Sequence, residues 1–288
     1  MLLGTFMLVI DRIYMLSPLQ VVTLLTAFIA LLVGYQWRHK QQLQQVLSQP
    51  LDYRCMVFLQ QALPIYQKLT EPLKQNLHQL MKQFLHEKQF VGCAGLVITD
   101  EMKWITSAQA CLLILNKPTT VYRSLKWIYI YPSSFFTERD NVDLAGVVSR
   151  QRHNLLGESW SNGKVILSWD DVKQGVQNFE DGHNVTLHEF AHQLDAESGR
   201  TNGAPLMYNA ADYLSWAKIL NKEFLQLQFD SQHGIHSVLS SYGATNPAEF
   251  FAVATEVFFE QPFALAHNHH ELFEQLLHYY RVDPRQWK

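Results

Sequence analysis

A run of 25 uncharged residues, from Ile13 to Trp37, constrains this chain of 288 residues more than any other feature. A bilayer core takes about 20 consecutive apolar residues in a helix, because only a helix satisfies its own backbone hydrogen bonds there. Arg38 and Lys40 follow the run directly, whereas only Arg12 lies close before it. Because Lys and Arg accumulate on the cytoplasmic side of a span, we expect a single-pass anchor helix over about 13–37, with the following domain facing the cytoplasm.

Other interpretations of this run stay open. A cleaved signal peptide is disfavoured, since the positive charge follows the apolar run and no A-x-A cleavage site precedes it. A buried core helix would make the protein soluble and cytoplasmic instead of an inner-membrane protein. The Gln-rich residues 38–50 are expected to form a helical extension or linker, and 51–288 a single sizeable domain.

Composition excludes several classes of protein. Hydrophobic residues make up 48% of the chain and charged residues 17%, which is unlike a disordered protein. The 23 basic and 26 acidic residues leave a net charge of -3, so the chain lacks the positive charge of a nucleic-acid-binding protein. Cys55, Cys93 and Cys111 form no CxxC pair, and we expect them to be reduced and buried in a cytoplasmic protein.

The hydrophobic pattern after Pro50 predicts an α+β domain. Leucines recur with helical spacing after Thr70, which suits the N-cap of a helix. Short β-type runs predict strands at Leu96–Thr99, Lys126–Tyr131 and Val165–Trp169. The dipeptide Asn162-Gly163 predicts a hairpin before the last of these. Helices are expected over 184–198, 209–227, 247–260 and 270–281. Strands early and helices late predict a small sheet with a helical C-terminal part.

The motif HExxH, formed by His188, Glu189 and His192, carries the chemistry of this sequence. On a helix, residues four apart stand one above the other, so both imidazoles reach one metal ion. Glu189 lies between them, where its carboxylate can hold a water molecule and take its proton. Asn184 suits the N-cap of this helix and Gly199 its end. The alternative is a surface helix with two solvated histidines.

A catalytic zinc ion takes three protein ligands and keeps one open position. Asp195 shares the helix of both histidines and approaches from the same side, so we expect it not to bind the metal. It would instead accept a hydrogen bond from a group behind the metal ligands, or be a polar residue in helix packing. The later helix offers Glu249 and Glu256, two turns apart on one face. Glu249 could also be the carboxylate of a capping box with Asn246, and Glu256 a salt-bridge or surface carboxylate. We prefer Glu249, but the residues alone leave both open.

Several stretches resemble the Mlc titration factor A family of bacterial zinc peptidases. They are His188–Asp195 (HEFAHQLD), Asn202–Leu206 (NGAPL), Tyr242–Phe251 (YGATNPAEFF), Ile166–Val172 (ILSWDDV) and, more loosely, Ile130–Phe135. The resemblance implies a zincin-like metallopeptidase domain of the gluzincin type. It also implies one Zn²⁺ held by His188, His192 and Glu249, with Glu189 as the general base. Tyr242 matches a family tyrosine that would donate to the oxyanion.

The resemblance also implies what the protein acts on. Family members cleave small peptides, which suggests an aminopeptidase, and bind a transcriptional repressor of the Mlc type, which suggests a role in the regulation of sugar uptake. The alternative is a repressor-binding regulatory protein in which peptidase activity is secondary. The apolar N-terminal run departs from the family, whose members are soluble. By analogy with zincin-like folds, an edge strand lines the cleft and pairs with substrate; we expect it to be formed by Val165, Ile166, Leu167, Ser168 and Trp169.

Overall fold

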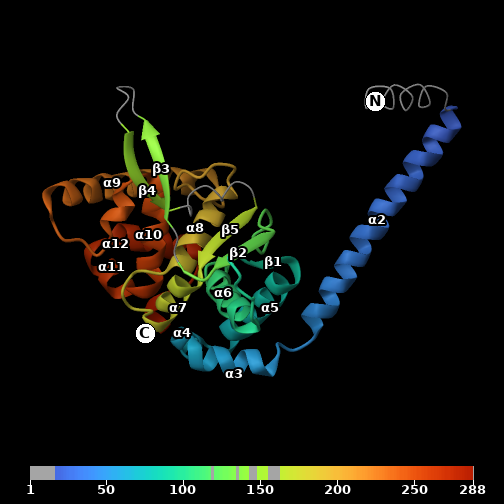
Figure 1. Cartoon of the computed structure of the whole chain (residues 1–288), viewed down its shortest axis with the longest axis horizontal. Coiled ribbons are helices and arrows are strands. Elements are labelled where there is room, and N and C mark those ends of the chain that lie inside the picture. The colour runs from blue at the N-terminus through green and yellow to red at the C-terminus, as the bar shows by residue number, and fades with distance from the viewer. Residues whose placement is uncertain (1–16, 118–119, 134–135, 143–147, 155–162, 288) are drawn as a thin grey trace. The chain divides into compact units, whose positions relative to one another are not determined.

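The computed structural model describes residues 17–117, 120–133, 136–142, 148–154 and 163–287. Contacts divide the chain into two compact units, Met1–Pro50 and Leu51–Lys288. In the first unit, α2 is one continuous helix over Pro18–Ser48 (Figure 1). It begins with a capping box in which Ser17 accepts from the backbone of Gln20, whose side chain in turn accepts from the backbone of Ser17.

Helix α2 is long and apolar enough to cross a membrane. None of the residues of α2 is buried, and its large apolar side chains are exposed. The helix continues through the Gln-rich residues 38–48 without a break. The expected start of the anchor, residues 13–16, lies outside the described residues.

The second unit is mostly helical and contains a small sheet (Figure 1). Its first part contains α3 (Tyr53–Ala62), α4 (Pro64–Lys68), α5 (Glu71–Glu87), β1 (Gln89–Gly92), α6 (Asp100–Leu112), β2 (Trp127–Tyr131), β3 (Phe136–Val142), β4 (Val148–Asn154) and β5 (Lys164–Ser168). Its second part contains α7 (Trp169–Gln177), α8 (Val185–Ala196), α9 (Ala210–His233), the 3-10 helix η3 (Ser241–Ala244), α10 (Pro247–Glu260), α11 (Pro262–Asn268), α12 (His270–Tyr280) and the 3-10 helix η4 (Pro284–Trp287). The four helices expected in the last third are confirmed.

Strands β1, β2 and β5 form a parallel sheet in that order. Ile128 pairs with Val165 and Ile130 with Leu167, and all four side chains are completely buried. Since side chains alternate along a strand, one face of the sheet is packed into the core. Helix α8 contacts β5 (Figure 1), so the sheet supports the helix that carries the HExxH motif.

The strand expected at Leu96–Thr99 is wrong. The chain turns after β1 at Ala94 and Gly95, which have positive φ angles of 50° and 81°. Thr99 then begins α6, because its hydroxyl accepts a hydrogen bond from the backbone N–H of Met102. The β-branched residues before the cap suggested a strand, whereas this capping interaction makes them a connection into a helix.

The hairpin expected before β5 is also wrong. Gly163 leads directly into β5, which pairs in parallel with β2, and parallel neighbours cannot be joined by a tight turn. Its carbonyl accepts from the backbone of Lys126 and Trp127 at the start of β2. Asn162 lies outside the described residues. An antiparallel ribbon does occur, but it is formed by β3 and β4, between β2 and β5 in the chain (Figure 1).

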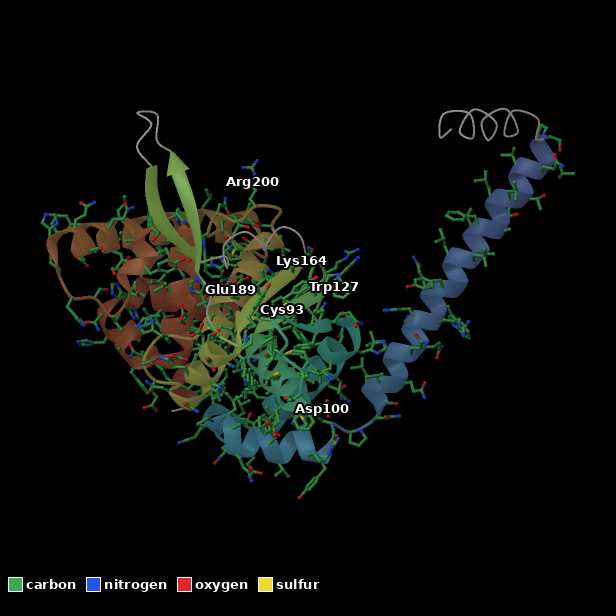
Figure 2. All side chains as sticks on the ribbon, viewed as in Figure 1. Cys93, Asp100, Trp127, Lys164, Glu189 and Arg200 are labelled. Atoms are coloured by element: carbon green, nitrogen blue, oxygen red, sulfur yellow. The ribbon has the colours of Figure 1, made fainter. Side chains whose placement is uncertain are left out.

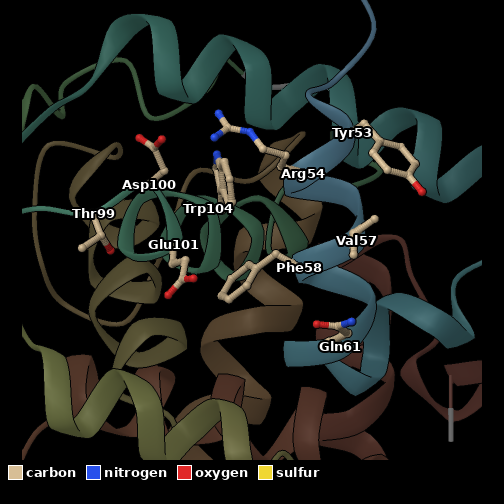
Figure 3. A pocket seen from close by; sticks show the side chains of 9 residues that line it. All are labelled: Tyr53, Arg54, Val57, Phe58, Gln61, Thr99, Asp100, Glu101 and Trp104. Atoms are coloured by element: carbon tan, nitrogen blue, oxygen red, sulfur yellow. The ribbon is translucent and has the colours of Figure 1, made fainter.

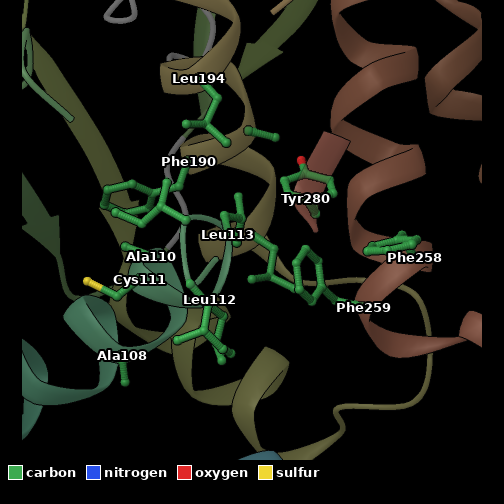
Figure 4. Packing of buried hydrophobic residues seen from close by; sticks show 14 of the residues in the cluster. Ala108, Ala110, Cys111, Leu112, Leu113, Phe190, Leu194, Phe258, Phe259 and Tyr280 are labelled. Atoms are coloured by element: carbon green, nitrogen blue, oxygen red, sulfur yellow. The ribbon is translucent and has the colours of Figure 1, made fainter. Parts of the chain in front are cut away.

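Helices α6, α8, α10 and α12 contribute to one hydrophobic cluster. Figure 4 shows Phe190 and Leu194 of α8 in this cluster together with Cys111, Leu112, Leu113, Phe258, Phe259 and Tyr280. The expected core stripe of α8 is confirmed, since Leu187, Ala191 and Leu194 are at most 1% exposed. Each fully buried large apolar side chain contributes about 1.5–3 kcal/mol, so α8 is held firmly in place.

The cysteines differ in their environments. Cys55 and Cys111 are buried, as expected, and burial raises the pKa of the Cys55 thiol to about 12. Cys93 is partly exposed, so the expectation that all three are buried is wrong. All three are free thiols.

Candidate metal centre

Helix α8 brings the two histidines of the motif together. Asn184 begins the helix, because its side-chain oxygen accepts from the backbone N–H groups of Thr186 and Leu187 at 3.1 Å. His188 and His192 follow one turn apart, with ring centroids separated by 4.8 Å. His192 is completely buried, so the alternative of a surface helix with solvated histidines is excluded.

Helix α10 supplies a carboxylate to the same place. Asn246 caps this helix by accepting from the backbone N–H groups of Ala248 and Glu249, and Pro247 occupies its first turn. Glu249 is only 6% exposed, and its carboxylate contacts the rings of α8. The N-terminal turn of α10 therefore aims Glu249 at His188 across the interface between the two helices.

Three donor atoms converge between α8 and α10. Oε2 of Glu249 is 3.0 Å from Nε2 of His188 and 3.4 Å from Nε2 of His192. The two Nε2 atoms are 3.1 Å apart. Ligand atoms on a tetrahedral zinc ion are about 3.3 Å from one another, given bonds of about 2.0–2.1 Å. The triangle of donors therefore has the size that one such ion requires, and the residues fit a metal.

The charges around this triangle favour a cation. Burial lowers the pKa of His188, but the carboxylates of Glu256 and Glu249 outweigh it and raise that pKa to about 10. Burial raises the pKa of Glu249, but hydrogen bonds with His188 and His192 bring it down to about 2. The pKa of His192 falls to about 4 because its ring is buried. An ionised carboxylate, a neutral imidazole and a second imidazole beside two carboxylates together form a site that attracts positive charge.

Tyr242 and Glu189 lie at the same centre. The ring of Tyr242, on η3, is 5.9 Å from that of His188, and the tyrosine is 50% exposed. Burial and the charges of Glu249 and Glu189 raise the pKa of the Tyr242 hydroxyl, which therefore stays protonated at neutral pH. Glu189 is 1% exposed, and its charge also acts on His188. The centre therefore combines a buried carboxylate with a half-exposed tyrosine.

Glu256 lies on the opposite side of the His188 ring from Glu249. Its Oε1 is 2.7 Å from Nδ1 of His188, whereas Glu249 contacts Nε2. The sequence offered Glu256 as a rival ligand or as a salt-bridge or surface carboxylate. It is buried and pairs with His188 on the Nδ1 side, so it is a paired carboxylate and not a surface one. The signal that could have identified it is the spacing of Glu249, Glu256 and Glu260, which places three carboxylates along one face of α10.

Asp195 supports a loop next to the centre. Its Oδ2 accepts a hydrogen bond of 2.7 Å from the backbone N–H of Gly203, whose carbonyl accepts from the indole of Trp216 at 2.8 Å. Burial raises the pKa of Asp195 to about 6. A Cβ atom at Gly203 would lie 2.3 Å from the carbonyl oxygen of Pro247, so only glycine lets this loop reach the start of α10. The part that Asp195 plays beside a bound metal stays a prediction.

The expected substrate-binding strand is present except for its last residue. Strand β5 contains Val165, Ile166, Leu167 and Ser168, and within the described residues it is an edge of the three-stranded sheet. Trp169 instead begins α7, because the hydroxyl of Ser168 caps that helix by accepting from the backbone N–H of Asp171. Val165 and Leu167 are buried in the core, while Ile166 is half-buried.

A separate hollow of about 600 Å³ lies between α3 and the start of α6 (Figure 3). Figure 3 shows Phe58 and Trp104 together, and their ring centroids are 5.8 Å apart. Figure 2 labels Asp100 at this hollow, well away from Glu189. Among the described residues, the three donors at α8 and α10 form the single cluster of His, Cys, Asp or Glu close enough to hold a metal ion.

Two histidines one helical turn apart, with a carboxylate from a helix later in the chain, are a donor set typical of metal-dependent hydrolases. Comparison with known proteins defines the class further. The model of the family described as glucose-regulated metallo-peptidase M90 matches residues 35–281. The chain therefore belongs to this family of metallopeptidases.

Relatives support the same assignment. The chain is 31% identical over 228 residues to Mlc titration factor A of Klebsiella pneumoniae strain 342, covering 78% of this chain and 85% of the relative. It is also 31% identical to Mlc titration factor A of Yersinia pestis strain Pestoides F, covering 77% and 82%. The uncharacterized protein slr2042 of Synechocystis sp. is 38% identical, covering 94% and 98%. The resemblance recognised in the sequence is thus confirmed.

Proposed function

We propose that this protein is a zinc-dependent peptidase of the gluzincin type with a zincin-like fold. The convergence of Nε2 of His188, Nε2 of His192 and Oε2 of Glu249 within 3.0–3.4 Å carries the proposal. Two imidazoles and one carboxylate suit zinc, whereas magnesium and calcium prefer oxygen ligands alone. Three protein ligands also leave one position open, as a catalytic site requires.

The residues around this site then have distinct roles in hydrolysis. Zinc, when bound, polarises the scissile carbonyl and lowers the pKa of water. Glu189 accepts the proton of the attacking water and passes it to the leaving amine. Tyr242 donates a hydrogen bond from its protonated hydroxyl to the oxyanion. His188, His192 and Glu249 hold the ion.

Metal removal tests this proposal directly. The purified protein is expected to contain one zinc ion per chain by elemental analysis, and a chelator should abolish its hydrolysis of short peptides. Zinc should restore the activity. Substrates with free and with acetylated N-termini distinguish an aminopeptidase, which we propose, from an endopeptidase. Full hydrolysis by protein shown to be free of metal would refute the proposal.

We also propose that β5 pairs with extended substrate along its free edge. Substitution of Ile166 by Pro removes one backbone donor from this strand, while Ile166→Ala shortens the side chain and keeps the donor. One lost hydrogen bond corresponds to about tenfold in affinity, so we expect the proline variant to lower kcat/KM about tenfold relative to the alanine variant. Equal kcat/KM values for the two folded variants would argue against this role.

The N-terminal segment is proposed to be a membrane anchor, with residues 1–37 as the anchor segment, 38–50 as its extension and 51–288 as the peptidase domain. The exposed apolar side chains of α2 support this, because they would face lipid. The protein is expected to stay in inner-membrane pellets after carbonate extraction, with the peptidase domain protected on the cytoplasmic side. A variant without residues 1–50 should be soluble. Release of the intact chain by carbonate would contradict the anchor.

A role in sugar-uptake regulation is a further part of the proposal. It rests on the family description, which includes glucose regulation, and on the name of the relatives. The same name makes a repressor of the Mlc type the candidate partner besides peptide substrates. Direct binding to nucleic acid is not proposed, because the net charge of the chain is -3.

A further inference from the structure

Helix α10 presents three buried carboxylates to α8. Glu249, Glu256 and Glu260 are 6%, 6% and 2% exposed, and they lie on one face of the helix. Burying a carboxylate costs several kcal/mol unless hydrogen bonds or opposite charge compensate for the lost water. Glu249 is compensated at the proposed zinc site. The two others require a separate explanation.

Glu256 is held by two donors, one at each carboxylate oxygen. Its Oε1 is 2.7 Å from Nδ1 of His188, and its Oε2 accepts the backbone N–H of Asn184 at 2.5 Å. Both are short hydrogen-bond distances. One contact is to a ring and the other to the backbone just before α8, so Glu256 connects the His188 side chain to a rigid part of the fold.

Asn184 and Glu260 complete the network behind Glu256. The side-chain nitrogen of Asn184 donates to Oε1 of Glu260 at 3.0 Å and to the carbonyl of Gly175 at 3.2 Å. Oε2 of Glu260 accepts the backbone N–H groups of Gly182 and His183 at 2.9 and 3.1 Å. Asn184 is therefore held in place by groups that do not contact the metal centre. Because its backbone N–H donates to Glu256, Asn184 in turn holds the Glu256 carboxylate in place.

The contact to Nδ1 determines how His188 can act. A carboxylate at Nδ1 keeps the ring proton on that nitrogen, so the lone pair of a neutral ring is on Nε2. Nε2 then faces Glu249 and His192 at 3.0 and 3.1 Å. Rotation of the His188 ring about its Cβ–Cγ bond would break the 2.7 Å contact between Nδ1 and Glu256. This contact therefore determines which ring nitrogen can bind the metal and in which direction it points.

We infer that Glu256 is a positioning residue that orients His188 toward the metal ion and fixes its tautomer. The inference rests on the proposed function, because it requires that His188 bind a metal. Loss of such an orienting carboxylate typically weakens metal binding about 10–100-fold without removing a ligand. The sequence assigned Glu256 no such role.

Zinc affinity tests the inference on the full-length protein. Glu256→Gln is expected to raise the zinc dissociation constant about 10–100-fold in competition with a chelator. Glu223→Gln is the matched control, because Glu223 is a buried carboxylate on α9 whose Oε2 is 2.8 Å from Nδ1 of His269, outside the network of Glu256, Asn184 and His188. The control should bind zinc as the wild type does. Equal zinc affinity in wild type and Glu256→Gln would overturn the inference alone, whereas a wild type that binds no zinc would overturn the proposed function with it.

The wild-type protein provides a second measurement that depends on no variant. Nitrogen NMR of the histidine rings in the zinc-loaded protein should show His188 with its proton on Nδ1 and with zinc, and no proton, on Nε2. A His188 ring with the proton on Nε2 and the metal on Nδ1 would overturn the inference even if Glu256→Gln failed to fold. Thermal unfolding of both variants without zinc shows whether a change in affinity exceeds a change in stability.

Discussion

Replacement of Glu189 by Gln is expected to lower kcat/KM for peptide hydrolysis by about 10²–10⁴-fold, because a general base contributes about that much. Gln has nearly the same shape but cannot accept the proton of the attacking water. Since Glu189 is absent from the three donors, the bound zinc should be unchanged. Parallel assays of hydrolysis and metal content, with wild type purified alongside, check both halves of this expectation.

The same variant separates the two functions that the family resemblance implies. If binding to a repressor of the Mlc type survives in Glu189→Gln while hydrolysis is lost, recognition does not depend on turnover. Unchanged hydrolysis by the variant, with full zinc content, would contradict the role of Glu189 as the base. Because the substituted side chain is 1% exposed, circular dichroism of the variant must first show an intact fold.

Removal of the Glu249 carboxylate is expected to weaken metal binding itself, which Glu189→Gln leaves unchanged. Glu249→Ala leaves two imidazoles from a single helix, which approach an ion from one side. Removal of a metal ligand must lower zinc affinity more than removal of a residue that orients a ligand. We therefore expect zinc affinity to fall by more than about 100-fold and hydrolysis to disappear. Calorimetric titration with zinc measures the affinity.

Glu271→Ala is the control for this substitution. Glu271 is a carboxylate whose side chain is 55% exposed and paired with Lys222 on the surface, so its removal should leave zinc binding and hydrolysis unchanged. Full zinc occupancy and activity in Glu249→Ala would show that another group completes the site. The proposed ligand set would then be wrong, whatever the behaviour of the other variants.

Much of the helical C-terminal part could be predicted from the sequence. Asn184 and Asn246 begin their helices by capping interactions within three residues, which depend on local sequence alone. The stripe of Leu187, Ala191 and Leu194 follows the helical period and is buried. Capping residues and helical periodicity depend on residues within one or two turns, so they predict these helices without knowledge of the rest of the fold.

The sheet was less predictable because strand pairing is decided at long range. Val165 and Leu167 alternate as a strand should, yet nothing local indicates that their partners are Ile128 and Ile130 in parallel register. A turn dipeptide suggested an antiparallel neighbour, whereas the described strand beside β5 is β2, which runs parallel to it. The connection from β2 to β5 instead contains the β3–β4 ribbon, whose two strands pair with each other.

The sequence by itself determined the two imidazoles one helical turn apart, the Glu189 carboxylate between them and an apolar helix long enough to span a membrane, since each depends on neighbours along one helix. Only the tertiary structure decided which acidic residue faces Nε2 of His188 and which faces Nδ1. Those carboxylates are 61 and 68 residues away in the chain, and both lie on one face of α10. The imidazole ring of His188 has its two nitrogens on different sides. The packing of α10 against α8 places Glu249 at Nε2 and Glu256 at Nδ1, and this is why the two carboxylates have different roles.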